Sequence, residues 1–108
     1  VAVGNYTMAA ALDGANNNTA VGYYALANVT TADSSVALGT GALGMLTTGS
    51  PNIGIGHNAM NVHTTGANNI AIGAFAMDDT NAGSNSLGSG DNIFIGKDSG
   101  GGTWADAP

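Results

Sequence analysis

One phrase of eight residues returns along the chain, most clearly as VALGTGAL at residues 36–43 and IAIGAFAM at residues 70–77. The other copies, two full and two shortened, are TAVGYYAL at 19–26, IGIGHNAM at 53–60, VAVG at 1–4 and IFIG at 93–96. The central glycines stand at positions 4, 22, 39, 56, 73 and 96, so the repeat steps are 18, 17, 17, 17 and 23 residues. A period near 17 residues without helical periodicity indicates a solenoid of stacked coils.

The composition of the chain limits its partners. Among 108 residues, Lys97 is the only basic residue beside seven aspartates, and the net charge is −6. Nucleic acids and anionic membrane surfaces both attract basic segments, so we expect neither as a partner. No segment approaches the roughly 20 apolar residues of a membrane span, which predicts no membrane insertion.

The length and the continuous repeat predict one domain, a repeat solenoid over residues 1–100 followed by a Gly-rich cap or linker over 101–108. Regularly spaced Val, Ile, Leu and Met distinguish the chain from a disordered linker. Cysteine is absent, so there is no disulfide framework and the redox compartment stays open. The chain starts inside a repeat without an initiator Met or a signal peptide, and we expect it to be a piece of a longer protein.

Each central glycine follows a stretch in which bulky and small residues alternate. Residues two apart on a strand share a face, so we predict short strands with a bulky face inside the coil and a small, flat face outside. The predicted core ladder is Val21, Leu38, Ile55, Ile72 and Ile95, with Val36, Ile53, Ile70 and Ile93 two residues before its members. The predicted outer positions are Ala20, Ala37, Gly54 and Ala71.

Three further positions are fixed in most repeats. A corner with one core side chain per coil is predicted at Ala25-Leu26, Ala42-Leu43, Ala59-Met60 and Ala76-Met77. A ladder of stacked amides is predicted at Asn18, Asn52, Asn69 and Asn92, with Ser35 at the equivalent position between Asn18 and Asn52. The turn and contact glycines are Gly22, Gly39, Gly56 and Gly73, together with Gly49 and Gly66 at a turn that we expect to need positive φ.

The core of such a chain is thin, because each coil encloses two or three bulky residues. Repeats of this kind need neighbours to complete their burial. The small, uncharged outer face would be an apolar patch in water. We therefore expect homo-oligomers that associate through the Ala/Gly face.

Three segments resemble a known family of repeats. NNTAVGYYAL (17–26), TTGSPNIGIGHNAM (47–60) and TTGANNIAIGAFAM (64–77) are similar to the NTAIGYxAL…NTTGxxN repeats of bacteriophage tail fibres and related virion fibre proteins. They are more distantly similar to the AIG repeats in the heads of trimeric autotransporter adhesins. The resemblance covers Val1 to about Gly100. With the repeat count, it implies an all-β fold: a left-handed parallel β-roll or β-helix of about six 17-residue coils, packed as a homotrimer.

The resemblance implies a structural segment of a trimeric phage tail fibre or virion fibre that supports host attachment, located in the virion. The implied partners are further copies of the chain, adjoining fibre segments and a host-surface glycan or protein receptor, with no cofactor. The alternative is the head of a bacterial trimeric adhesin, at the cell surface or outside the cell. A remote alternative is an ice-binding solenoid, suggested by stacked pairs at Thr30-Thr31, Thr47-Thr48 and Thr64-Thr65.

Residues 78–91 are an insertion that matches no repeat. Loops on a rigid scaffold commonly carry binding, and a terminal irregularity is the structural alternative. The candidate receptor-binding residues are Asp78, Asp79, Asn81, Asn85 and Asp91. The oxygens of Asp78, Asp79, Asn81 and Asp91 could coordinate Ca²⁺, but the segment matches no calcium-binding motif and we predict no metal site.

The remaining side chains of chemical interest are two histidines and the aromatic residues. A threefold axis could gather copies of His57 or His63 around Zn²⁺, but His57 shares its repeat position with Tyr, Thr and Ala, which favours simple exposure. Tyr24 and Phe75 share one position and predict an exposed ridge that packs against the next subunit or stacks on a sugar. Trp104 is expected to cap the open end of the solenoid. No catalytic constellation is found, so we expect no enzyme activity.

Overall fold

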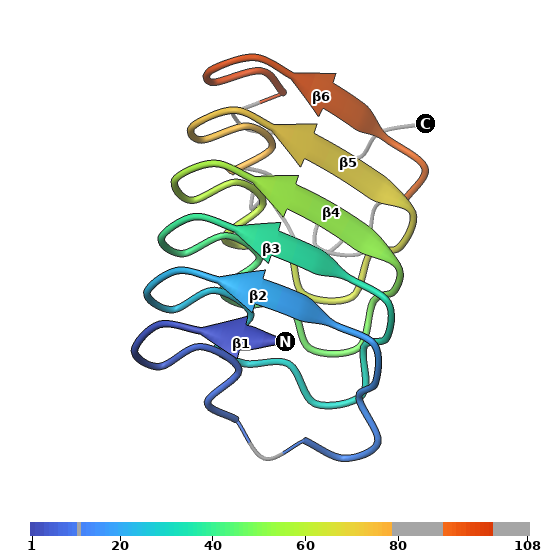
Figure 1. Cartoon of the computed structure of the whole chain (residues 1–108). Helices are drawn as coiled ribbons and strands as arrows, with labels where there is room; N and C mark the ends of the chain where they lie inside the picture. The colour runs from blue at the N-terminus through green and yellow to red at the C-terminus, as the bar shows by residue number, and fades with distance from the viewer. Residues whose placement is uncertain (11, 79–89, 101–108) are drawn as a thin grey trace.

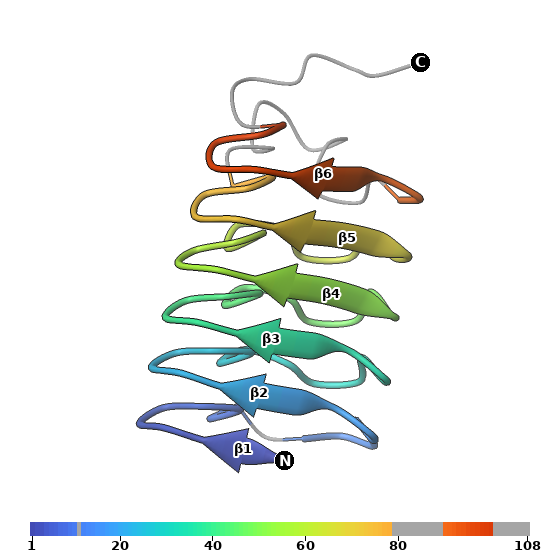
Figure 2. The ribbon, with the colours of Figure 1, turned by 45° about the horizontal axis from the view of Figure 1, so that its top comes forward.

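The computed structural model describes residues 1–10, 12–78 and 90–100. This part of the chain contains no helix, and its strands are β1 (Ala2–Val3), β2 (Thr19–Val21), β3 (Val36–Leu38), β4 (Asn52–Ile55), β5 (Asn69–Ile72) and β6 (Ile93–Ile95). The six strands form one parallel sheet in chain order (Figure 1). After β2, β3 and β4, a turn leads the chain behind the sheet and back to the next strand (Figure 2). The chain is an all-β solenoid, as the repeat predicts.

The strand register follows the repeat register. Ala20 pairs with Ala37, Ala37 with Gly54, and Gly54 with Ala71. The long last step keeps this register, because Ile70 pairs with Ile93. Behind the sheet, the Leu43 N–H donates to the carbonyl of Ala59 at 2.9 Å, and equivalent bonds link the other coils. Equal positions of the repeat therefore stack directly over one another.

Two predictions about the ends of the chain reach beyond the described residues. The count of six full coils includes residues 79–89, and the C-terminal cap or linker with Trp104 falls in residues 101–108. The connections from β2 to β5 are described throughout, and each spans one repeat.

The two faces of the strands are reversed relative to the prediction. Ala20, Ala37 and Ala71, which were predicted to lie outside, are fully buried. Of the predicted core ladder, Val21 is 38% exposed and Ile95 is 67% exposed, while Leu38, Ile55 and Ile72 are half-buried. The bulky side chains thus lie on the outer face of the sheet, and the small residues point into the coil.

The corner opposite the strand explains this reversal. Its side chains, Leu26, Leu43, Met60 and Met77, are fully buried, which confirms the predicted one core side chain per coil. A Cβ added to Gly54 would lie 3.0 Å from Leu43 Cγ and 3.3 Å from the carbonyl oxygen of Ala59. Because strand and corner approach so closely, the inward position of β2 to β5 holds only Ala or Gly. In β6 the paired position holds Phe94, which packs against the end of the core. A small residue at this repeat position therefore indicates crowding inside the coil and not a flat outer surface.

The crowded interior predicts the effect of adding volume at Ala37. The Ala37→Val substitution should lower the free energy of unfolding by about 1–3 kcal/mol, because the extra methyl groups meet a filled interior. Urea unfolding followed by circular dichroism measures this change. Thr31→Val, at an exposed position, is the control. Equal unfolding midpoints for Ala37→Val and the parent chain would contradict the inward assignment of the alanines.

Candidate functional site

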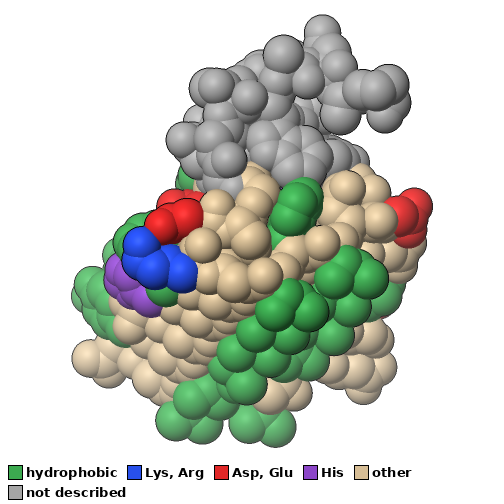
Figure 3. Space-filling model, turned by 90° about the horizontal axis from the view of Figure 1, so that it is seen from above, with side chains coloured by type: hydrophobic (Ala, Val, Ile, Leu, Met, Phe, Trp, Pro, Cys, Tyr) green, Lys and Arg blue, Asp and Glu red, His purple; other side chains and the backbone are tan. Residues whose placement is uncertain are grey.

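The outer face of the sheet carries two adjacent rows of apolar side chains. One row is Val3, Val21, Leu38, Ile55, Ile72 and Ile95, and the other includes Val36, Ile53, Ile70 and Ile93. We call these two rows the apolar sheet face. Figure 3 shows hydrophobic side chains gathered in a continuous band over this side of the molecule. The positions of both rows hold no charged residue.

This surface is unusual for a chain that remains alone in water. Monomeric proteins rarely expose contiguous apolar patches larger than a few hundred Å². Both rows are most exposed in β6, where Ile93 is 66% exposed, and are half-buried in β3, β4 and β5. A shallow hollow of about 220 Å³ lies beside Val36, Pro51 and Ile53. The apolar sheet face is therefore the main candidate for an interaction surface between chains.

The predicted asparagine ladder is present at the start of the strands, and Asn18, Asn52 and Asn69 are buried there. Asn52 Oδ1 accepts hydrogen bonds from the Asn69 backbone N–H at 3.0 Å and from Asn69 Nδ2 at 3.1 Å. Asn69 Oδ1 accepts the equivalent pair from Asn92, at 3.1 and 3.0 Å. Ser35 continues the ladder, since its Oγ accepts from the Asn52 N–H and its own N–H donates to Asn18 Oδ1. These bonds connect one coil to the next, which is a structural role.

The central glycines are required for two physical reasons. Gly22, Gly39, Gly56 and Gly73 have φ between 127° and 133°, a region that glycine alone adopts readily. A Cβ on Gly39 would also lie 2.7 Å from the carbonyl oxygen of Gly56 in the next coil. These glycines therefore approach the next coil of their own chain closely.

The glycines of the other predicted turn do not behave as expected. Neither Gly49 nor Gly66 has positive φ. A Cβ on Gly49 would collide with the carbonyl oxygen of Gly66. Close approach between coils, and not the backbone dihedral angle, accounts for glycine at position 49.

The candidate receptor-binding loop is described only at its ends. Asp79, Asn81 and Asn85 lie outside the described residues. Asp78 is half-buried, and Asp91 is exposed with its N–H donating to the carbonyl of Ala67 at 3.0 Å. Within residues 1–10, 12–78 and 90–100, no three His, Cys, Asp or Glu side chains lie close enough together to hold a metal ion. The described part of the loop gives no geometry for a binding site.

The two histidines occupy different environments. His57 is exposed, and its ring packs edge-on against Phe75 with ring centroids 5.2 Å apart. His63 is fully buried, with Nε2 3.2 Å from Nδ2 of Asn69. The same repeat position in the two preceding coils holds Val29 and Leu46, both fully buried. This interior position, seven residues after the central glycine, was missed in the sequence because Val, Leu and His share no obvious pattern.

Three tyrosines of the first two coils form an exposed aromatic cluster. The rings of Tyr6 and Tyr24 are stacked, with centroids 5.1 Å apart and an angle of 24° between their planes. Tyr23 packs edge-on against both rings. Tyr24 is 43% exposed and Tyr23 49% exposed. The aromatic ridge predicted from Tyr24 and Phe75 is interrupted between them, because Gly41 and Asn58 hold the same repeat position in the two intervening coils.

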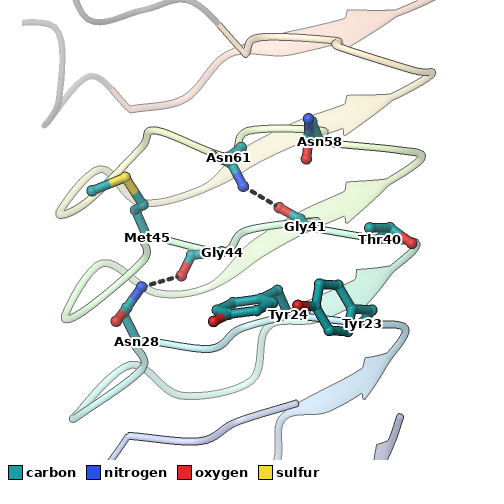
Figure 4. A pocket seen from close by; sticks show the side chains of 9 residues that line it. All are labelled: Tyr23, Tyr24, Asn28, Thr40, Gly41, Gly44, Met45, Asn58 and Asn61. Carbon is teal, nitrogen blue, oxygen red and sulfur yellow. Dashed lines mark hydrogen bonds between the residues drawn. The ribbon is translucent and has the colours of Figure 1, made fainter. Parts of the chain in front are cut away.

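A hollow of about 400 Å³ opens beside this cluster (Figure 4). We call it the notch. Its lining includes Tyr23, Tyr24, Asn28, Met45, Asn58 and Asn61 around Gly41 and Gly44. Two of its lining residues are glycines at positions where adjacent coils carry side chains. Tyr24 and Asn58 hold the repeat position of Gly41, and Ala27 and Asn61 hold that of Gly44. The ends of the Asn58 and Asn61 side chains reach over the two glycines. The hydrogen bond from Asn61 Nδ2 to the Gly41 carbonyl measures 2.7 Å, as does that from Asn28 Nδ2 to the Gly44 carbonyl.

Comparison of the chain with protein-family models, curated proteins and solved structures finds no match. In the described part of the chain, no helix has the length and apolar character of a membrane span. Function is therefore inferred from the repeat and from the surfaces of the solenoid.

The hydrogen bonds of Asn52 predict a large effect of its removal. Asn52→Ala leaves the buried N–H of Asn69 and the carbonyls of Gly49 and Gly66 without the side chain that now pairs with them. We expect a loss of at least about 1–3 kcal/mol in the free energy of unfolding, the cost of one unsatisfied buried group. Asn52→Ser should lose less, because Ser35 holds the equivalent position in the preceding coil. Chemical unfolding of both variants tests this order, and equal stability of Asn52→Ala and the parent chain would refute the role of the ladder.

Proposed function

We propose that the chain is a structural segment of a trimeric bacteriophage tail fibre or virion fibre, in which three left-handed solenoids pack side by side and support host attachment. The repeat resemblance supports the class of protein. The observation that carries the proposal is the apolar sheet face, which runs along the stack on one side of the chain.

The geometry of the solenoid favours association along its length. Parallel strands stack in register, so the two apolar rows are continuous across coils. Burying a Val, Leu or Ile side chain that is otherwise exposed contributes about 1.5–3 kcal/mol, and each row supplies several partly exposed side chains. Three copies around a common axis would remove these rows from water together. The proposed contact surface is the Val/Ile/Leu face and replaces the Ala/Gly face expected from sequence.

The charges of the chain are compatible with this packing. The net charge of −6 makes separate copies repel one another. The charged side chains that the structure describes nevertheless lie outside the strands. Examples are Asp33, Asp91 and the exposed ion pair of Lys97 with Asp98. None lies in either apolar row, so association would bury no side-chain charge of these rows.

The oligomeric state tests the proposal directly. The chain of 10.5 kDa should have three times this mass by light scattering coupled to size-exclusion chromatography. Ile55→Lys, which places a charge in the middle of the apolar sheet face, should give monomers, because an unpaired charge is costly to bury. Thr48→Lys, at an exposed position outside that face, should remain trimeric. A parent chain that is monomeric at high concentration, or an Ile55→Lys variant that is still trimeric, would rule out a trimer built on this face.

The adhesin alternative predicts the same trimer but a different location. Gold-labelled antibodies against the chain should mark fibres on virions if the fibre proposal is correct. Labelling of bacterial surfaces, with none on virions, would favour the adhesin head instead.

The ice-binding alternative gains no support from the threonine ladder. The hydroxyl groups of Thr30 and Thr47 donate to the carbonyls of Thr47 and Thr64, at 3.2 and 3.1 Å. These bonds join coils and explain the threonines structurally. A thermal hysteresis measurement tests this alternative, and we expect none.

A further inference from the structure

We propose that the notch binds a neutral saccharide, with the Tyr24 ring as a stacking platform and the amides of Asn28, Asn58 and Asn61 as partners for sugar hydroxyls. One chain builds the whole notch, so the proposal goes beyond the structural role and does not depend on the trimer.

The Tyr24 ring is positioned by two neighbouring tyrosine rings and remains partly exposed to solvent. Tyr6 stacks on one side of it, and Tyr23 packs edge-on at a centroid distance of 4.6 Å. In Figure 4 the ring lies beneath the segment that contains Gly41 and Gly44, which have no side chains to cover it. The π face of an aromatic ring is electronegative and attracts the weakly positive C–H groups on the apolar face of a pyranose. A platform fixed before binding loses little conformational entropy when the ligand arrives.

The polar groups of the notch suit hydroxyls better than ions. An amide side chain offers an acceptor oxygen and two N–H donors. Asn28 and Asn61 each use one N–H on a backbone carbonyl, which leaves an oxygen and a second N–H for a ligand. Sugar hydroxyls both donate and accept, so they match this set. No charged side chain lines the notch, which disfavours phosphates and acidic sugars.

The size and place of the notch also fit a short saccharide. Its volume of about 400 Å³ lies within the range of about 300–1,000 Å³ typical of small-molecule sites. Its lining comes from turns that follow β2, β3 and β4, and it includes none of the two apolar rows. Trimer formation through the apolar sheet face would therefore leave the notch open to solvent.

The repeat offers variants that should alter the notch without breaking the coil. Gly41 has φ +71°, and Asn58 holds the same repeat position at φ +54°. The backbone at position 41 should therefore accept Asn. A Cβ there would meet the end of the Asn58 side chain, so Gly41→Asn should displace that amide and fill the notch. Tyr24→Asn removes the platform at the same type of position. Phe75→Asn is the matched control, since Phe75 occupies this repeat position but lines no part of the notch.

The test uses the full chain and a panel of free neutral hexoses, N-acetylhexosamines and their disaccharides. Saturation-transfer difference NMR should detect at least one ligand, and titration calorimetry then compares the variants. We expect Tyr24→Asn and Gly41→Asn to weaken binding at least about tenfold, equivalent to about 1.4 kcal/mol, with no change for Phe75→Asn.

Three results would overturn the proposal. The first is no saturation transfer to any member of the panel. The second is unchanged affinity in both notch variants. The third is a change of oligomeric mass in Tyr24→Asn or Gly41→Asn but not in Phe75→Asn, which would make the notch a subunit contact. Mass and affinity are separate measurements, so failure of the saccharide proposal is distinguishable from failure of the trimer.

Discussion

In-register hydrogen bonding between successive coils is the constraint on which the rest of the structure depends. Parallel pairing places equal repeat positions over one another at the strand spacing of about 4.8 Å. Each residue must therefore fit against the residues directly above and below it in the neighbouring coils. This explains why Asn69 stands over Asn52, and why the backbone at Gly39 approaches the carbonyl of Gly56 too closely for a side chain. A single repeat position must satisfy the same geometry in every coil.

The narrow coil then separates the side chains into those that fill the interior and those that form the outer face of the sheet. The corner contributes one Leu or Met per coil to the interior, and the strand facing it holds only Ala or Gly in β2 to β5. The bulky strand residues have no space inside and form an outer surface. A chain with so thin an interior gains much of its available apolar burial from contact with other chains, which links its stability to its assembly.

The solenoid, its register and the buried amide ladder could be predicted from the sequence, because each depends on spacing alone. The direction of the strand faces could not. Alternation of Ile55 with Gly54 is equally compatible with either face inside, and only the position of Leu43 across the coil decides between them. The predicted receptor-binding segment drew attention because it departs from the repeat. The notch could not be predicted, because Gly41 and Gly44 look like the other glycines of the repeat in the sequence. What distinguishes them is that equivalent positions in adjacent coils carry side chains.

The stacked ladders also determine how such a molecule can change its length. Removing 17 residues at equivalent points takes one rung from the backbone, amide and glycine ladders together and leaves the remaining rungs in register. A connection of another length can also keep the register, because Ile70 pairs with Ile93 across the 23-residue last step. The axial length is thus quantised in units of about 4.8 Å, one coil at a time. A gene that gains or loses whole repeats would lengthen or shorten the scaffold while the surfaces of the remaining coils stay the same.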